Sequence, residues 1–240
     1  MKTQMLYREF GKYYDLIYSM KDYKKEADQI TKIIKRYKKT KCNELLDVAC
    51  GTGSHLKYLK KRFSCTGVDI NKPMLDVARE NIKGVEFKPA NMIDMKLGRQ
   101  FDAITCLFSS IGYTKTYANL EKTMKNFAGH LKKGGVLIIE PWLTKQQFID
   151  GHIHFDSFQD KRINLARMGT SRKKGDISIL EMHYLLGEKG KGIKHFVDKH
   201  ELGLFSVSRT LQIMKKAGLQ AKYIKGGLIR QRGLYIGVKK

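Results

Sequence analysis

A short apolar segment that ends in a glycine-containing turn limits the folds open to this chain more than any other feature. Residues 44–49 (ELLDVA) form an apolar run of strand length, and a Cys-Gly-Thr-Gly sequence at 50–53 follows directly. Glycine permits a sharp turn and lets the backbone approach a ligand closely. Leu56 and Leu59 then resume helical spacing. The segment therefore predicts a buried strand, a turn and a helix in immediate succession.

Strands and helices alternate through the first 150 residues. Ile30, Ile33 and Ile34 recur at helical spacing before the first strand. Further segments of strand length lie at 65–70, 85–87, 101–108 and 135–140, and helical segments such as 117–131 separate them. Alternation of this kind predicts a parallel sheet with helices on both faces.

The pattern changes after about residue 150. Apolar and polar residues alternate through 154–205, with glycine-containing breaks at 173–175 and 187–192, which is typical of an antiparallel meander. The chain then returns to a helix at 208–217. It finishes with strands at 221–224 and 233–238, which are expected to pair as an antiparallel hairpin.

An acid at the end of the second predicted strand limits which class of cofactor can bind. Asp69 follows Asp47 by about 22 residues, where a carboxylate can accept both hydroxyls of a ribose. Dinucleotide sites carry a third glycine in the first turn, close to the pyrophosphate, whereas His55 and Leu56 occupy that region here. A cofactor without a pyrophosphate does not need that glycine. We therefore expect S-adenosyl-L-methionine, with its amino-acid part near Gly51 and its ribose at Asp69.

These patterns together predict one fold class. We expect an α/β protein, with a Rossmann-like seven-stranded methyltransferase sheet and an inserted antiparallel β-meander. Residues 1–150 and 205–240 would form the cofactor-binding domain. Residues 151–204 would form the insert and contribute to the acceptor site, to a dimer contact, or to both.

The acceptor is expected at the carboxyl ends of the fourth and fifth strands, because ligands of open α/β sheets bind outside those ends. The sequence there reads FSSIGY at 108–113 and EPW at 140–142. It lacks the Asn/Asp-Pro-Pro-aromatic tetrad used for the exocyclic amines of bases. Cys106 has no neighbouring proline, which argues against a nucleophile for cytosine C5.

Several segments resemble the N,N-dimethyltransferases that act on nucleotide-linked 3-amino sugars in desosamine and mycaminose biosynthesis. The matching segments are LLDVACGTG (45–53), FSSIGY (108–113), EPW (140–142), GxxHFxDxH…LF (192–205) and RGLYIGV (232–238). They span nearly the whole chain and include the meander, which generic methyltransferases do not share. The resemblance implies a SAM-dependent N-methyltransferase, a homodimer, and a nucleotide-linked amino sugar or similar small acceptor.

The turn, the strand ends and the resemblance together give the candidate site residues. Those expected to bind the cofactor are Tyr14, Tyr23, Asp47, Ala49, Gly51, Gly53, Asp69, Ile70, Met74, Asn91, Met92 and Phe108. For the acceptor, the resemblance implies Tyr7 and Tyr113 beside the amine, and Ser110, Trp142, Ser171 and Arg232 against sugar or phosphates. Structural interpretations stay open: Tyr14 or Tyr23 could be a half-buried contact, Trp142 a core residue, Arg232 a surface charge, and Asn91 an ordinary loop residue.

Tyr113 departs from the family pattern, since some members have histidine at this position. A neutral tyrosine is a much poorer base than a histidine near neutral pH. Either the amine loses its proton to water before it reacts, or another group such as His195 or His200 helps. We expect Tyr113 to orient the amine rather than to deprotonate it.

Charge and composition leave other functions open. Lys and Arg outnumber Asp and Glu by 47 to 23, which gives a formal charge of +24 and makes RNA an alternative acceptor. A non-catalytic SAM-binding protein is a further alternative. The four scattered cysteines and the absence of a long apolar run or secretory signal predict a cytoplasmic protein without a membrane span. No metal is expected, because the histidines lack an accompanying carboxylate cluster.

Overall fold

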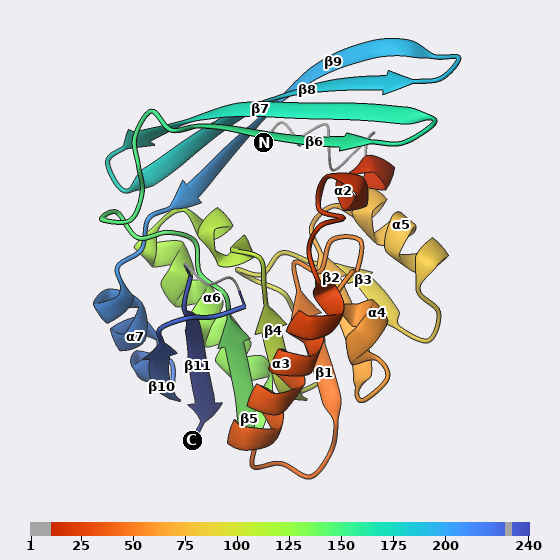
Figure 1. Ribbon diagram of the computed structural model, residues 1–240. Coiled ribbons are helices and arrows are strands. Elements are labelled where there is room, and N and C mark those ends of the chain that lie inside the picture. The colour runs from red at the N-terminus through yellow and green to blue at the C-terminus, as the bar shows by residue number, and fades with distance from the viewer. Residues whose placement is uncertain (1–10, 229–231) are drawn as a thin grey trace.

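The computed structural model of the protein describes residues 11–228 and 232–240 (Figure 1). A large sheet contains β1 (Glu44–Val48), β2 (Ser64–Asp69), β3 (Glu86–Pro89), β4 (Phe101–Cys106), β5 (Leu131–Ile139), β10 (Leu219–Ile224) and β11 (Leu234–Lys239). A second sheet contains β6 (Ile153–Gln159), β7 (Ile163–Lys174), β8 (Ile177–Glu188) and β9 (Gly192–Gly203). The helices are α2 (Gly11–Ile17), α3 (Tyr23–Tyr37), α4 (Leu56–Leu59), α5 (Lys72–Asn81), η1 (Ser110–Thr114), α6 (Tyr117–His130) and α7 (Val207–Lys216).

The large sheet has the strand order β10-β11-β5-β4-β1-β2-β3. The strands from β3 to β5 are parallel, and β11 runs antiparallel to both β5 and β10. The chain moves outward from β1 to β3 and then returns to β4 on the other side of β1. This reversal leaves a crevice at the carboxyl ends of β1 and β4, where ligands of such sheets bind.

The order confirms the predicted fold class: a seven-stranded Rossmann-like sheet with a separate antiparallel sheet of four strands. The fourth strand was expected to reach residue 108 but ends at Cys106. The reason is local, because the backbone of Phe108 and of Ser109 is left-handed, with φ of 51° and 64°. Extended backbone cannot continue through two such residues.

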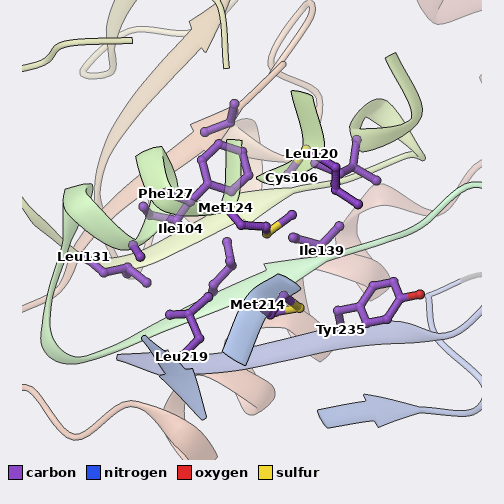
Figure 2. Close-up of a cluster of buried hydrophobic side chains, with 14 of the residues drawn as sticks. Ile104, Cys106, Leu120, Met124, Phe127, Leu131, Ile139, Met214, Leu219 and Tyr235 are labelled. Carbon is purple, nitrogen blue, oxygen red and sulfur yellow. The ribbon is translucent and has the colours of Figure 1, made fainter. Parts of the chain in front are cut away.

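The core consists of two apolar layers, one on each face of the large sheet. Successive residues of a strand point to opposite faces, so Leu45 packs with α3, α4 and α5, whereas Leu46 packs with α6 and α7. Figure 2 shows the second layer, a buried cluster that includes Phe127 and Met124 of α6, Met214 of α7 and Ile104 of β4. Burial on both faces explains why the parallel strands read as continuous apolar runs.

Helix α3 illustrates how the sequence specifies these layers. The Asp22 side chain accepts a hydrogen bond from the Lys25 N–H at 2.9 Å and caps the first turn. Ala27, Ile30 and Ile34 then form one fully buried stripe against the sheet. The helix confirms the prediction made from the isoleucine spacing.

The antiparallel sheet lies over the carboxyl edge of the large sheet (Figure 1). Short turns separate β7 from β8 and β8 from β9. The first contains Gly175 and the second contains Gly190 and Gly192, and these three glycines have positive φ. Helix α2 packs beneath the sheet, where Tyr13 joins Tyr184 and Phe196 in a small apolar cluster. None of the helices in residues 11–228 and 232–240 is long and apolar enough to cross a membrane.

We predict that Gly67→Ala in β2 destabilises the fold by roughly 1–3 kcal/mol, because small-to-large changes in a packed core force side chains to move. A Cβ at Gly67 would lie 2.8 Å from both Leu56 Cδ1 and Phe87 Cδ1. Urea denaturation measures the change. The matched control is Gly129→Ala in α6, where an added Cβ meets nothing within 4 Å, and this variant should be at least as stable as wild type. Equal stability of the two variants would contradict the prediction.

Candidate active site

The turn after β1 and the acid after β2 hold each other in place. Ala49, Gly51 and Gly53 all have positive φ, of 56°, 56° and 78°. The Gly51 N–H donates to Asp69 Oδ2 at 2.9 Å, which joins the carboxyl ends of the two strands. Gly53 also lacks room for a side chain, since a Cβ would lie 2.7 Å from Ile82 Cδ1. The turn therefore depends on glycine for conformation and for space.

Asp69 is 6% exposed and lies beside the end of β3, paired in register with Pro89. Burial raises the pKa of Asp69 above its ordinary value, and hydrogen bonds from the Asn71 and Gly51 N–H groups offset part of this. Oδ1 already accepts from the backbone and side-chain N–H groups of Asn71, whereas Oδ2 accepts only from Gly51 among the contacts of the described residues, so Oδ2 has a lone pair for a ribose hydroxyl. The neighbouring Ile70 side chain is 61% exposed and offers an apolar surface next to the acid.

Asn91 follows β3, where the adenine contact was expected. Its Oδ1 accepts a hydrogen bond from the Ile93 N–H at 3.1 Å and closes a local turn. This hydrogen bond is a structural contact, and it leaves the oxygen a second lone pair for the expected adenine amine. Met92 packs against the core cluster of α6, and Met74 of α5 is buried beneath Gly51, whose Cβ would lie 3.5 Å from Met74 Cε.

Helix α2 is fastened to the glycine turn by one carboxylate. Asp15 Oδ1 accepts from the Thr52 hydroxyl at 2.7 Å and from the Ser54 hydroxyl at 3.0 Å. A hollow of about 50 Å³ lies above the turn. Its walls include the expected residues Tyr14, Tyr23, Asp47, Ala49, Gly51 and Phe108.

Asp47 lies at the end of β1 below this hollow and is almost fully buried. Burial raises the pKa of Asp47 to about 6, despite the opposing effects of His55 and of the Thr105 hydroxyl, which donates to Asp47 Oδ1 at 2.7 Å. A carboxyl group with this pKa is largely ionised at neutral pH.

A buried ionic network that the sequence analysis missed borders the same hollow. Glu26 Oε2 accepts from His55 Nε2 at 2.7 Å, and its other oxygen pairs with Lys21. Burial acts to raise the pKa of Glu26, but the hydrogen bonds from His55 and Lys21 lower it overall. The Lys21 ammonium also lies 4.9 Å from the centre of the Phe108 ring. Lys21 therefore brings a positive charge close to the cofactor end of the crevice.

A larger cavity of about 620 Å³ opens between the two sheets. Its wall comes from α2, from the loops that follow β4 and β5, from Arg232 just before β11, and from the inner face of the antiparallel sheet. Residues on this wall include Tyr14, Tyr18, Phe108, Ser109, Ser110, Tyr113, Trp142, His152, His154, Arg167, Ser171, Tyr184, His200 and Arg232. Tyr14, Phe108 and Ser110 line both spaces, so the cavity adjoins the hollow above the glycine turn.

The expected acceptor residues at one end of this cavity contact each other. Arg232 Nη1 donates to Ser109 Oγ at 2.6 Å, and its guanidinium lies 4.6 Å from the centre of the Trp142 ring. The Trp142 indole N–H donates to Ser178 Oγ at 2.9 Å. Burial lowers the pKa of Arg232 from its usual value. Arg232 is therefore a largely buried cation, not a solvated surface charge.

Two further expectations have clear placements. The Ser171 hydroxyl lies 3.2 Å from the carbonyl oxygens of Ile149 and His152, which fasten the segment before β6 to β7. Tyr113 Oη lies 2.7 Å from His200 Nδ1, whereas His195 is exposed on the other face of β9, beside His183. The structure thus brings His200 to the acceptor cavity and excludes His195 from it. Tyr7 lies outside the described residues.

The inner face of the meander supplies polar residues that the sequence analysis did not single out. Arg167 pairs with Asp156 and donates to the Tyr18 hydroxyl at 2.8 Å. His152 and His154 have nearly parallel rings on the same wall. The alternation of residues along β6 and β7 carried this signal, since every second side chain faces the cavity. Among the described residues, no cluster of His, Cys, Asp and Glu side chains could hold a metal ion.

A sheet of this order, with a glycine turn after β1, an acid after β2 and a cavity at the carboxyl edge, defines the class I methyltransferases. Residues 45–135 match the family described as a methyltransferase domain. The chain is 37% identical to dTDP-3-amino-3,4,6-trideoxy-alpha-D-glucopyranose N,N-dimethyltransferase of Streptomyces venezuelae, over 94% of this chain and 95% of that protein.

Solved structures agree with this match along the whole chain. Streptomyces venezuelae DesVI superimposes with a TM-score of 0.91 at 35% identity, covering 96% of this chain and 98% of that one. SAM-bound CalS10, an amino pentose methyltransferase from Micromonospora echinaspora, does so with a TM-score of 0.82 at 31% identity, covering 92% of each chain. This chain therefore belongs to the family of SAM-dependent N-methyltransferases of amino sugars, as the resemblance implied.

Glu140 generates a prediction about the strained loop after β4. Its Oε2 accepts the Phe108 N–H at 2.7 Å, and this bond holds the first of two consecutive left-handed residues. Backbone strain at a non-glycine residue of this kind costs about 1–3 kcal/mol and persists only where surrounding contacts fix it. We expect Glu140→Ala to lower the free energy of unfolding by roughly 1–3 kcal/mol, since a buried N–H loses its acceptor.

The control for this prediction is Glu140→Gln, which keeps a side-chain oxygen for the Phe108 N–H. Chemical denaturation measures the free energy of unfolding of both variants. Glu140→Gln should lower it by less than half as much as Glu140→Ala does. An equal loss in the two variants would show that the hydrogen bond does not hold the loop.

Proposed function

We propose that this enzyme methylates the amine of a nucleotide-linked 3-amino sugar. The observation that carries the proposal is the cavity of about 620 Å³ that adjoins the glycine-turn hollow and contains the largely buried cation Arg232. A space of this size suits a small molecule. A planar guanidinium is suited to binding phosphate oxygens in pairs. Identity to a dTDP-amino-sugar N,N-dimethyltransferase over most of both chains supports the same acceptor class.

The residues around the glycine turn fit S-adenosylmethionine. The left-handed turn at Gly51 leaves its backbone open to the amino-acid part of a cofactor, and the Asp69 carboxylate suits a ribose diol. Tyr14 and Tyr23 would cover the cofactor from the N-terminal side, and Ile70 would contact its base. When bound, the cofactor would supply a methyl group on a cationic sulfur: the amine lone pair attacks the methyl carbon in line, and the neutral thioether leaves with the electrons of the broken S–C bond.

The acceptor side of the cavity positions the sugar and excludes water. Arg232 would bind the phosphates, and Ser109, already in contact with Arg232, lies near the same anion. The Trp142 ring and the Ser110 and Ser171 side chains would contact the sugar. Because the antiparallel sheet covers this space, the reacting nitrogen would be shielded from solvent, which favours transfer to the amine.

Proton removal does not require a strong base in this arrangement. Tyr113 of η1 lines the cavity, and a neutral phenol does not deprotonate an ammonium group efficiently. We infer that the amine binds after losing its proton to water. Alignment of a neutral amine is then the main contribution of the protein.

RNA is the second candidate acceptor, favoured by the formal charge of +24. The covered position of the cavity argues against it, because a base of a folded RNA would have to enter between the two sheets. A non-catalytic cofactor-binding role is disfavoured by the Arg232 and Trp142 pair, which equips the acceptor side. Both alternatives remain outcomes of the turnover test.

We expect turnover with dTDP-3-amino-3,6-dideoxyhexoses, detected by mass spectrometry as additions of about 14 or 28 mass units. Parallel reactions contain the 4-amino isomers, tRNA and rRNA. Asp69→Ala serves as the control variant: it should lose cofactor binding in calorimetry, since no carboxylate remains for the ribose, and it should lose turnover with it. Methylation of RNA with no sugar touched would establish the RNA alternative. Cofactor binding without turnover of any amine would favour a non-catalytic role.

We also propose that two copies of the chain associate through the outer face of the antiparallel sheet. This face carries an exposed apolar patch: Phe155 pairs in register with Met168 across β6 and β7, and Ile153, Leu185 and Ile193 extend the patch. The formal charge of +24 makes two copies repel each other, so we expect a second copy to bind on this apolar patch. The insert, residues 151–204, would then serve the acceptor site with one face and the dimer with the other.

The free cysteines support a reducing, cytoplasmic setting.

Light scattering tests the association. Wild type should have twice the 27.7 kDa mass of the chain, and Phe155→Lys combined with Met168→Lys should give monomers, because charges would be buried unpaired in the contact. The control is Met20→Lys, which changes an apolar residue that is 95% exposed and lies outside the sheet. If the double variant remained dimeric, this face would be ruled out as the dimer contact.

A further inference from the structure

Tyr113 and His200 form a hydrogen-bonded pair at the wall of the acceptor cavity. Tyr113 lies in η1, directly after β4, and His200 lies near the end of β9, 87 residues further along the chain. The Tyr113 Oη to His200 Nδ1 distance is 2.7 Å. The ring centroids are 6.1 Å apart at an angle of 55°, so the two side chains meet through their polar atoms rather than by stacking.

The backbone around the pair is built for this contact. Gly112 precedes Tyr113, and a Cβ at Gly112 would lie 2.9 Å from Leu202 Cδ2 and 3.2 Å from Trp142 Cβ. Glycine thus lets η1 lie directly against β9. Leu202 and His200 are two residues apart, on the same face of the strand. The close approach at Gly112 therefore fixes where the Tyr113 hydroxyl meets the imidazole.

His200 is only 4% exposed, and burial together with Arg167 lowers its pKa to about 4. It is therefore neutral at physiological pH, with one nitrogen as donor and the other as acceptor. Two arrangements satisfy the contact: the Tyr113 O–H donates to Nδ1, or Nδ1–H donates to the Tyr113 oxygen.

The two arrangements have opposite consequences for an amine in the cavity. If Nδ1–H donates to the tyrosine oxygen, the phenolic proton can turn toward the amine and bind the lone pair that must react. If Tyr113 donates its proton to Nδ1, its oxygen offers lone pairs to the cavity and can accept an N–H of the amine. That contact directs the nitrogen lone pair away from Tyr113 and leaves it available.

We propose that His200 is a positioning residue, which accepts the Tyr113 proton at Nδ1 and so makes the tyrosine an acceptor for an amine N–H of the substrate. The inference rests on the proposed function and adds to it the choice of proton position. It also gives a role to tyrosine at a position where some family members have histidine. In this chain Tyr113 would contact the amine, and the His200 imidazole would contact Tyr113.

The first measurement is the histidine tautomer, by nitrogen NMR on protein labelled with ¹⁵N-histidine at pH 7, with His200→Phe to assign the signal. The expected spectrum has an unprotonated Nδ1 and a protonated Nε2 for His200. Tyr113→Phe should shift the Nδ1 resonance, since its donor is lost. A protonated Nδ1 in the wild type would overturn the proposal. This measurement needs no acceptor, so it is decisive even if the proposed function fails in the turnover screen.

The second measurement is kinetic and uses a double-mutant cycle. His200→Phe and Tyr113→Phe should each lower kcat by about 3- to 10-fold, the range expected for one neutral hydrogen bond, with acceptor KM changing less. Cofactor affinity by calorimetry should stay within about twofold. The double variant should be no slower than Tyr113→Phe, since the pair acts as a unit. Fully additive losses would overturn the proposal.

A conservative variant and a matched control separate positioning from packing. His200→Asn retains a side-chain oxygen as acceptor and should recover part of the kcat lost in His200→Phe. His195→Phe changes an exposed histidine of the same strand and should leave kcat unchanged. If Asn and Phe at residue 200 were equally slow with the same melting temperature, the hydrogen bond would have no role.

Discussion

The hydrogen bond from the Gly51 N–H to the Asp69 carboxylate is the contact on which the rest of the site depends. It joins the carboxyl ends of β1 and β2, next to the crevice between β1 and β4 where the strand order reverses. It needs a left-handed residue at Gly51 and a buried acid at Asp69, and neither would persist without the packed layers on both faces of the sheet. The glycine turn, the helix α2 fastened to it by Asp15 and the hollow between them all follow from this one junction.

Much of the fold could be predicted from sequence because its determinants are local and periodic. Fully buried strands read as apolar runs, the half-buried meander reads as alternation, and glycine marks the turns between them. The miss at the end of the fourth strand has a different origin. The residue types of Phe108 and Ser109 do not predict left-handed backbone. The Phe108 N–H is held by the carboxylate of Glu140, which lies 32 residues away in the sequence.

The same distinction between local sequence patterns and long-range contacts applies to the site residues. The glycine turn and Asp69 were predictable because their spacing along the chain fixes their positions. Arg167 with Tyr18, Lys21 with Glu26, and Tyr113 with His200 were not, since each of these contacts depends on how separate segments pack. The resemblance supplied Trp142 and Arg232 as site residues, but only the structure shows that the guanidinium lies against the indole ring.

The two sheets divide the chemistry between them. The parallel sheet offers backbone N–H groups, a buried acid and left-handed turns, which suit a cofactor of fixed shape. The antiparallel sheet offers side chains at every second position, so its inner face can vary one residue at a time without disturbing a turn. Tyrosine at residue 113 fits this arrangement, because β9 places His200 Nδ1 2.7 Å from its hydroxyl. Acceptor specificity can then change through the meander and the loops facing it while the cofactor site stays intact.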